Sequence, residues 1–187
     1  MTPKENHAAI MARSGTALTI TLFRYVPAVI AARAGPRQKL IMLRDLSDQV
    51  MKEIAPNSPC QKGCSHCCHM ATTISRHEAE EIGKRVNRTP KKVTALLNRE
   101  AQIKRFSGKP CPFLKDNACS IYDIRPIACR IHHSIEESAD PCDISKGVRD
   151  VAQVDLMKIA DSVSMVTFPA SLGDIREYFP PRLTPGG

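Results

Sequence analysis

The sequence has little of what several common classes of protein require. It contains no tryptophan, and aromatic residues make up 4% of its 187 residues, so a nucleic-acid surface built on base stacking would be short of rings. It shows no internal repeat, no alternation of strand and helix patterns, and only one Gly-Gly pair, at residues 186–187. A parallel α/β sheet is therefore not expected.

Long uninterrupted hydrophobic runs are also missing. The most apolar stretch, residues 16–32, contains Arg24 near its centre and Pro27 shortly after it. These residues interrupt the apolar core that a secretory signal needs, and they leave too short a run for a membrane span. Such a segment is more typical of a core helix or of a helix that lies on a surface. We therefore expect no membrane span and a cytoplasmic, reducing location.

Cysteine is absent from residues 1–59 and 143–187, so all eight thiols fall into two blocks. The first block has four cysteines within nine residues, Cys60, Cys64, Cys67 and Cys68, and the second has Cys111, Cys119, Cys129 and Cys142. A reducing compartment disfavours disulfides, and thiolates are preferred ligands of zinc and of iron–sulfur clusters. The sequence therefore predicts a cysteine-ligated metal centre, with all eight cysteines as candidate ligands.

Short spacings such as Cys-x3-Cys and Cys-x2-Cys bring several sulfur atoms of one loop onto one ion or cluster. Cys60, Cys64 and Cys67 form such a local set, with Gly63 freeing the backbone to turn, and the second block would close the site. Cys68 cannot easily point the same way as Cys67, so one of these two could serve a second metal or pack as a small apolar residue. Eight thiols suffice for two four-coordinate sites, or for one 4Fe–4S cluster with four to spare.

Four histidines near the cysteines are candidate replacements for a thiol ligand. They are His66, His69, His132 and His133. Each of them, taken singly, is more often an ordinary exposed or hydrogen-bonded histidine. Arg130 directly follows Cys129, and a guanidinium there would offset the negative charge of a thiolate centre. Arg125 is expected to do the same or to pair with Asp123.

Three other interpretations of the cysteines are weaker. A disulfide framework would require export. A catalytic thiol needs one base beside it rather than four thiols in nine residues. The spacing Cys60-x3-Cys64-x2-Cys67 is also that of radical SAM enzymes, but these set it in a partial β/α barrel with glycine-rich segments, of which this sequence shows no sign.

The net charge of +8 is concentrated in one segment. Residues 84–109, called the basic segment below, contain nine basic residues and one acidic residue, Glu100. They are either a pair of solvated helix faces or a docking surface for an acidic protein partner or nucleic acid, the latter with little support from aromatic residues.

Hydrophobic periodicity and capping signals predict mainly helices. Ser75 and Glu78 form a capping box, and Thr89-Pro90 signals a second helix start. The expected elements are helices at residues 38–54, 75–87, 89–106, 125–133, 146–163 and 172–178, with a small hairpin over 113–122. The predicted fold class is mainly α: a small helical domain with an irregular cysteine-rich loop region and at most a short β-hairpin, organised around a metal centre.

The chain divides into three predicted parts. Residues 1–37 are an N-terminal extension, partly disordered or helical, and residues 38–165 are a single cysteine-cluster metal-binding domain. Residues 166–187 are a short C-terminal helix followed by a disordered tail.

The cysteine pattern resembles that of the cysteine-cluster proteins, which carry the putative zinc- or iron-chelating domain. The matching residues are Cys60, Cys64, Cys67 and Cys68, then Cys111-Pro112-Phe113-Leu114, then Cys119-Ser120-Ile121-Tyr122 through Arg125-Pro126 to Cys129-Arg130. The resemblance implies chelation of zinc or iron through the cysteines. It also leaves an enzyme role open, because a related cysteine cluster occurs in flagellin lysine methylases. His132 and His133 depart from the pattern, in which an aromatic residue is expected nearby.

We therefore expect a metal-binding protein that coordinates an iron–sulfur cluster (4Fe–4S favoured) or zinc and acts as an electron-transfer or accessory module. One alternative is an iron–sulfur-dependent enzyme for redox or group-transfer chemistry. Another is a zinc-stapled interaction or nucleic-acid-binding module that uses the basic segment. No catalytic acid, base or nucleophile stands out.

Overall fold

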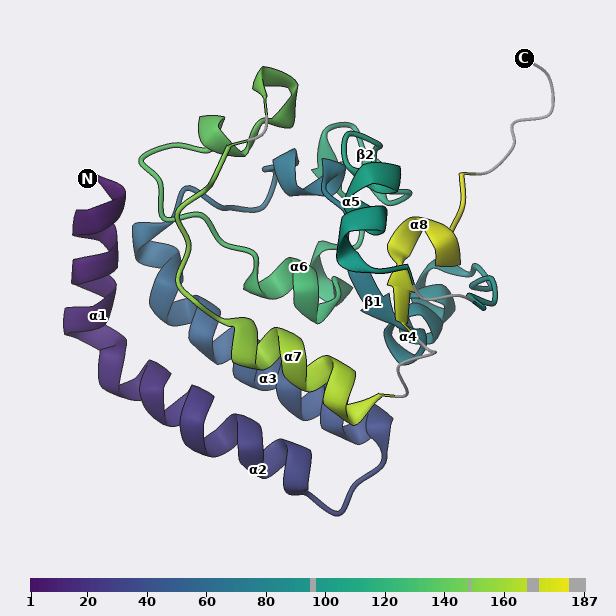
Figure 1. Ribbon diagram of the computed structural model, residues 1–187, viewed down its shortest axis with the longest axis horizontal. Coiled ribbons are helices and arrows are strands. Elements are labelled where there is room, and N and C mark those ends of the chain that lie inside the picture. The colour runs from purple at the N-terminus through teal and green to yellow at the C-terminus, as the bar shows by residue number, and fades with distance from the viewer. Residues whose placement is uncertain (95–96, 148, 168–171, 182–187) are drawn as a thin grey trace.

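The computed structural model describes residues 1–94, 97–147, 149–167 and 172–181, and this part of the chain is mainly helical (Figure 1). The helices are α1 (Pro3–Ile20), α2 (Val26–Ala31), α3 (Pro36–Ile54), α4 (Arg76–Val86), α5 (Arg99–Phe106), α6 (Ile127–Ile131), α7 (Met157–Val166) and α8 (Ile175–Tyr178). The strands are β1 (Thr73–Ser75), β2 (Leu114–Lys115), β3 (Ala118–Cys119) and β4 (Leu172–Asp174), and they form the antiparallel pairs β1–β4 and β2–β3. The predicted fold class is confirmed.

The chain begins with a long helix. Thr2 caps α1 in a reciprocal arrangement with Glu5, and a π-helical turn at Thr21–Tyr25 joins α1 to α2. The resulting helix, Pro3–Ala31, is long and apolar enough to cross a membrane by length and composition, and 28% of its most apolar window is buried. Core helices and signal sequences share this property, so the expectation of no membrane span stays a prediction.

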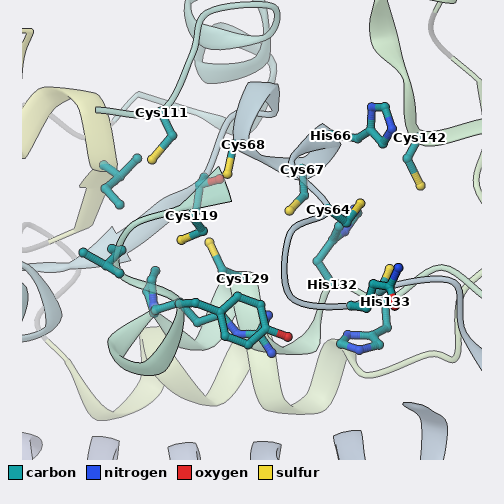
Figure 2. A pocket seen from close by; sticks show the side chains of 18 residues that line it. Cys64, His66, Cys67, Cys68, Cys111, Cys119, Cys129, His132, His133 and Cys142 are labelled. Carbon is teal, nitrogen blue, oxygen red and sulfur yellow. The ribbon is translucent and has the colours of Figure 1, made fainter. Parts of the chain in front are cut away.

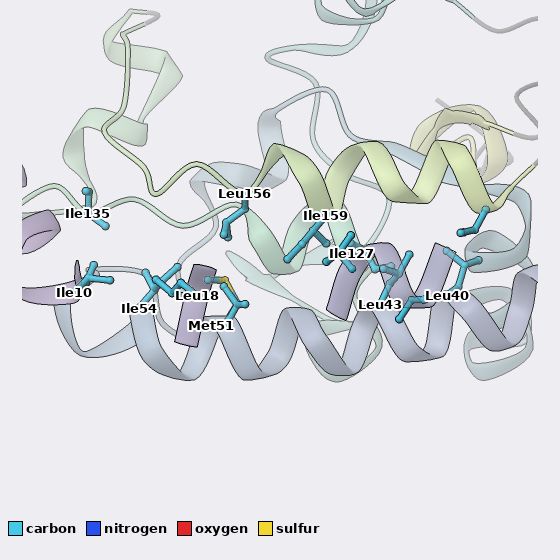
Figure 3. Close-up of a cluster of buried hydrophobic side chains, with 14 residues drawn as sticks. Ile10, Leu18, Leu40, Leu43, Met51, Ile54, Ile127, Ile135, Leu156 and Ile159 are labelled. Atoms are coloured by element: carbon cyan, nitrogen blue, oxygen red, sulfur yellow. The ribbon is translucent and has the colours of Figure 1, made fainter. Parts of the chain in front are cut away.

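The main hydrophobic core lies between α3 and the helices that pack on it. In Figure 1, α2, α3 and α7 run side by side, and Figure 3 shows the aliphatic side chains that meet between them. Leu43, Ile54 and Ile159 are fully buried, and Ile127 of α6 joins them. Burying one such side chain contributes about 1.5–3 kcal/mol. The helix expected over residues 38–54 is therefore confirmed as α3, with its apolar stripe in this core.

A smaller core supports the cysteine-rich loops. Ile74 of β1 lies opposite Gly173 of β4, and Phe113 meets Phe179 edge to face with ring centroids 5.0 Å apart. Gly173 suits its position because a Cβ atom there would lie 2.9 Å from Val93 Cγ1. This strand pair replaces the first half of the helix expected over 172–178, so that only the short α8 remains helical.

Two local predictions are confirmed. The amide of Ser75 donates to the Glu78 carboxylate at 2.9 Å, and the Ser75 hydroxyl accepts from the Glu78 amide, so the capping box starts α4. The short hairpin forms as β2–β3, and its turn places Asp116 and Asn117 in the left-handed conformation with φ of 49° and 56°. Aspartate and asparagine tolerate this conformation better than most residues.

The helix predicted to start after Thr89-Pro90 starts later, at Arg99. The backbone in between is used for a tertiary contact, because the amide of Lys91 donates to the carbonyl of Tyr178 at 2.8 Å. A local start signal is thus overridden by pairing with the C-terminal part of the chain. Leu96, which falls within the predicted helix over 89–106, lies outside the described residues.

The helix predicted over 146–163 also starts later, at Met157. Residues before it run alongside the segment that follows α6, where the amide of Ile135 donates to the carbonyl of Ala152 at 2.9 Å. An extended pairing therefore takes the place of the first helical turns. Val148, assigned to the predicted helix, lies outside the described residues.

The three-part division of the chain stays a prediction. Residues 1–37 include Ile10, Leu18 and Val26, which are buried in the main core. Within the predicted C-terminal part, β4 and α8 complete the smaller core, and residues 182–187 of the expected tail lie outside the described part of the chain.

Candidate metal centre

All eight cysteines line one pocket beside the helical core (Figure 2). Its cavity measures about 50 Å³. Because one water molecule needs about 10–15 Å³, the cavity has room for more than a single bare ion. Within the described ranges, no three His, Cys, Asp or Glu side chains already converge as the ligands of one metal ion would. The structure thus brings the predicted residues together, and their roles as ligands stay predictions.

A tight loop and a short 3-10 turn shape the first cysteine block. Gly63 has a φ of 102°, which favours glycine, and the amide of Cys64 bonds back to a carbonyl three residues earlier at 3.0 Å. The turn at His66–His69 then carries Cys67 and Cys68. The expected role of Gly63 in turning the loop is confirmed.

Backbone hydrogen bonds join the two blocks. The amide of Cys111 donates to the carbonyl of Cys68 at 2.7 Å, and the amide of Gly108 donates to the carbonyl of His69 at 2.8 Å. Cys119 ends β3, directly after the hairpin turn, and Cys129 lies in the middle of α6. Separate elements, each fixed by its own local structure, therefore deliver sulfur atoms to the pocket.

A buried arginine of α8 fastens this junction, and the sequence analysis missed it. Arg176 is 6% exposed and donates to the carbonyls of Cys68 at 3.0 Å and Lys109 at 2.6 Å. Asp174, fully buried, balances its charge at 3.1 Å and accepts the Thr72 amide at 2.7 Å. In the sequence these residues look like an ordinary surface pair, since their partners lie up to 108 residues away.

Two charged side chains hold α6 in place. Glu78 of α4 accepts the first amide of α6 at 2.9 Å. Arg130 donates to Asp48 of α3 at 2.6 Å and to the carbonyls of Arg125 and Asp123. Arg130 is not among the residues that line the pocket, and its expected role in offsetting the charge of the thiolates stays a prediction.

Arg125 is the guanidinium that faces the thiols. It lines the pocket and stacks on Tyr122, with its central carbon 4.1 Å from the ring centroid. Its buried Nε atom has no hydrogen-bond partner among the described residues. Of the two roles expected for Arg125, the structure favours the one beside the cysteines.

Three thiols share hydrogen bonds near Arg125. The Cys68 thiol is bonded to the sulfur atoms of Cys67 and Cys119, and these bonds, followed by burial, raise its pKa. Accepting from Cys68 is the main reason why the pKa of Cys67 falls to about 7 and that of Cys119 to about 6, and Arg125 lowers both further. The surroundings of Cys67 and Cys119 therefore favour thiolate, the form that binds metals.

Cys111 and Cys129 complete what we call the five-thiol group: Cys67, Cys68, Cys111, Cys119 and Cys129. Burial raises the pKa of Cys129 well above its usual value, and the charges of Cys67, Cys111 and Cys119 add to this rise. Burial also raises the pKa of Cys111 to about 11. Figure 2 shows the sulfur atoms of Cys68, Cys111, Cys119 and Cys129 on one side of the pocket, with that of Cys67 between them and Cys64.

The other three cysteines, Cys60, Cys64 and Cys142, form what we call the three-thiol group. The amide of Ser134 donates to the Cys60 sulfur at 3.4 Å. Burial raises the pKa of Cys142 to about 11; a hydrogen bond with Ser134 opposes the rise, and the charges of Cys60 and Cys64 add to it. Cys67 influences both Cys64 and Cys142, so it lies between the two groups.

The candidate histidines differ in position. His66, His132 and His133 line the pocket, whereas His69 is not among its lining residues. Burial lowers the pKa of His133 to about 4, and burial, followed by the charge of Arg99, lowers the pKa of His132. Both imidazoles are therefore neutral at pH 7, as metal ligation requires. They follow the end of α6 rather than lying on its face, because the helix ends at Ile131.

The donors in the pocket suit a soft metal or an iron–sulfur cluster. The described residues that line it include eight thiols and three imidazoles but no carboxylate. Hard cations such as Mg²⁺ and Ca²⁺ prefer oxygen ligands, whereas thiolates and imidazoles select zinc, iron and iron–sulfur clusters. Fold and site together define a small, mainly helical protein whose cysteine-rich loops offer the donor atoms of a candidate metal centre.

Comparison with protein families leads to the same class. Residues 59–146 match the sequence model of the CxxCxxCC family, described as a putative zinc- or iron-chelating domain. This match confirms the resemblance inferred from the cysteine spacing over this part of the chain, and it supports metal binding as the general function. A search of curated proteins gives no match to the chain, and a search of solved structures gives none either.

Proposed function

We propose that the five-thiol group holds an iron–sulfur cluster, with 4Fe–4S favoured, and that the protein is an electron-transfer or accessory module. The observation that carries this proposal is that these five thiols line one pocket and interact with one another beside Arg125. A structural zinc ion takes four ligands in a closed tetrahedron, and the cavity is larger than one ion needs. Such a cluster supplies one-electron redox chemistry when bound.

The protein's own residues would hold and tune the cluster. Arg125 places positive charge beside the thiolates and so offsets part of their negative charge. Ile121 and Ile175, both buried, give the pocket an apolar wall that limits the access of water. Hydrogen bonding, net charge and solvent exposure are the properties by which a protein sets the potential of such a centre.

The basic segment provides a docking surface near the pocket. Its exposed basic residues are Lys84, Arg85, Lys91, Lys92, Arg99, Lys104, Arg105 and Lys109. Arg99 lies near enough to His132, a residue of the pocket wall, to lower its pKa together with burial. A cytoplasmic protein partner with an acidic surface would therefore be steered toward the pocket.

A reductive titration tests this function. The anaerobically purified protein is titrated with dithionite while its visible absorption and its electron paramagnetic resonance spectrum are followed. We expect the visible absorption to bleach reversibly and a paramagnetic signal to appear and vanish with it. A protein that gives neither change would not be a redox module; its cysteines would then be structural, and the basic segment would carry a binding function.

A further inference from the structure

The long helix formed by α1 and α2 is apolar on more sides than the fold covers. Ile10, Leu18 and Val26 face the main core, whereas Ile20 and Phe23 are exposed to solvent. Of the most apolar window of this helix, 28% is buried. A helix that is hydrophobic all round is normally buried on every side, and an exposed apolar patch commonly marks an interaction surface. The outer side of this helix is therefore expected to bind something.

A π-helical turn places aromatic side chains on this outer side. The turn spans Thr21–Tyr25, and such turns within longer helices are frequent at functional sites. Three consecutive residues of the turn, Phe23, Arg24 and Tyr25, are exposed, while Val26 directly after them is buried. Phe23 is 64% exposed and Tyr25 is 45% exposed, and no other aromatic side chain in the described part of the chain is as open to solvent.

A cation accompanies each of the two rings. The central guanidinium carbon of Arg24 lies 5.9 Å from the centroid of the Tyr25 ring. The Nζ atom of Lys158, on α7, lies 4.5 Å from the centroid of the Phe23 ring. The surface is therefore cationic as well as apolar.

Acidic residues of the fold do not neutralise these cations. Residues 6–44 contain six basic residues and no aspartate or glutamate. In the described ranges, Arg24, Arg33 and Lys158 take part in no ion pair. The acidic residue of α7, Asp161, is exposed three residues after Lys158, so the positive surface ends there.

We propose that this surface, the outer face below, binds a membrane that contains anionic phospholipids, with the helix lying along the membrane surface. It comprises the exposed side chains of Ile20, Phe23, Arg24, Tyr25, Arg33 and Lys158. The apolar side chains would enter the boundary between headgroups and acyl chains, and the cations would meet lipid phosphates. Helices at membrane surfaces combine these two contributions, and tyrosine is enriched at the level of the headgroups.

Two other occupants fit the outer face less well. A helix that spanned the membrane would have to leave the core that Ile10, Leu18 and Val26 help to form, and it would place Arg24 among acyl chains, which is costly. A second copy of the chain would set like charges against one another, which opposes association. A lipid surface of negative charge meets neither difficulty.

The outer face is separate from the metal centre and from the basic segment. In Figure 1, α3 and α7 lie between α2 and the part of the chain that carries the cysteines, so a membrane bound at α2 leaves the pocket open to a partner. The basic segment is cationic too, but among its described residues Ile103 is the one large apolar side chain that is exposed. The proposal does not depend on which metal the cysteines hold.

A single tryptophan can test the proposal, because the natural chain contains none. Phe23→Trp is mixed with vesicles of phosphatidylcholine alone or of phosphatidylcholine with phosphatidylglycerol, and its fluorescence is recorded. With the anionic vesicles we expect emission at shorter wavelength and quenching by brominated lipid, both weakened by high salt. The matched control is Ile103→Trp, at a 45% exposed position of α5, and it should show neither change.

Cosedimentation with the same anionic vesicles measures single contributions. Arg24→Gln removes one cation and should weaken binding about fivefold. Phe23→Ser removes an apolar ring and should weaken binding roughly tenfold or more. Both side chains are exposed, so the variants should fold as the wild type does. Lys104→Gln, which removes one exposed cation of the basic segment, should leave binding unchanged.

Four results would overturn the proposal. No change of Phe23→Trp emission with anionic vesicles would exclude membrane binding at this face, and an equal change in Ile103→Trp would mean that binding is not confined to it. Equal binding to neutral vesicles would show that the cations do not select the surface. Emission that shifts with protein concentration in the absence of vesicles would assign the outer face to a second copy. Wild-type protein that resists alkaline extraction from membranes would indicate a span instead.

Discussion

The helical part of the molecule (α1, α2, α3, α6 and α7) and the cysteine part (residues 58–126 with β4 and α8) are held together in different ways. Among the described residues, fourteen buried apolar side chains form the core of the first, whereas eight form the core of the second. The cysteine part depends instead on individually placed polar contacts, such as those of Arg176 and Glu78. Hydrophobic burial can therefore account for the stability of the helical part. The stability of the cysteine part should depend on these polar contacts and on a bound metal.

This difference determines how strongly a single substitution should affect the stability of each part. An apolar core shares its stabilisation among many contacts, so the loss of one side chain weakens it in proportion to the atoms removed. The contacts of Arg176 all depend on one side chain. Removing that side chain leaves Asp174 buried with an uncompensated charge. The predictions below test this comparison, from the largest expected effect to the smallest.

The largest effect should follow loss of the metal. We expect Cys129→Ser, Cys64→Ser and Cys67→Ser to lower bound metal, because the free energy of metal binding is partly free energy of folding, on the order of 10 kcal/mol for a structural zinc ion. Hydrogen exchange should then rise in the cysteine part and much less in α3 and α7. Full metal content and unchanged stability in all three variants would mean that the pocket is not a metal centre.

Arg176→Ala should come next. The substitution breaks a buried ion pair and the hydrogen bonds to the carbonyls of Cys68, Met70, Lys109 and Pro110, which costs about 3–5 kcal/mol. Denaturant unfolding and metal content measure the effect. The control is Arg37→Ala, which breaks the exposed pair with Glu80 and should cost about 1 kcal/mol or less. Equal losses of unfolding free energy in the two variants would mean that the contacts of Arg176 stabilise the protein no more than an exposed ion pair does.

Ile159→Ala provides the opposite case. Ile159 is fully buried in the core of the helical part, so its truncation should cost about 2–5 kcal/mol of unfolding free energy. At temperatures where the variant stays folded, its metal content should equal that of the wild type. If metal is lost as readily as in Arg176→Ala, the two parts are not distinct in the way described.

Arg125→Gln should leave the fold intact and change the thiols. Without the guanidinium, the pKa values of Cys67 and Cys119 should rise from about 7 and about 6. Less thiolate is then present at pH 7, so alkylation of the metal-free protein by iodoacetamide should slow, by up to about tenfold for one pKa unit. Arg125→Lys should retain most of the wild-type rate. An unchanged alkylation rate in Arg125→Gln would mean that Arg125 does not lower the pKa values of these thiols.

The smallest structural effect is expected on the surface. Lys104→Glu changes an exposed residue of the basic segment, so stability should change by less than about 0.5 kcal/mol. Association with an acidic redox partner should nevertheless slow, and its rate should depend less on salt. Lys4→Glu, an equal change of charge on α1, serves as the control and should leave the association rate unchanged.

The local features of this molecule were predictable from the sequence. The capping box at Ser75 and Glu78, the turn at Gly63 and the hairpin between Phe113 and Cys119 depend on neighbouring residues alone. The clustering of cysteines also pointed to one place in the fold, because thiols spaced for metal binding have to meet.

Features that depend on distant partners were not predictable in the same way. The start of α5 is displaced by the bond between Lys91 and Tyr178, and the direction of Arg130 is set by Asp48, 82 residues away. Nothing in the sequence near Arg130 distinguishes it from Arg125, so the structure was needed to show that Arg125 lines the pocket. His133 could be named as a candidate ligand, but its burial beside Ser134 needed the structure.

The most direct test of the account is an analysis of iron, zinc and acid-labile sulfide in the anaerobically purified protein, with an absorption spectrum of the same sample. The account predicts iron and sulfide in equal amounts and broad visible absorption from charge transfer between sulfide and iron. A colourless protein that contains zinc alone would contradict the iron–sulfur assignment. A folded protein that contains no metal and takes up none would contradict the metal centre itself.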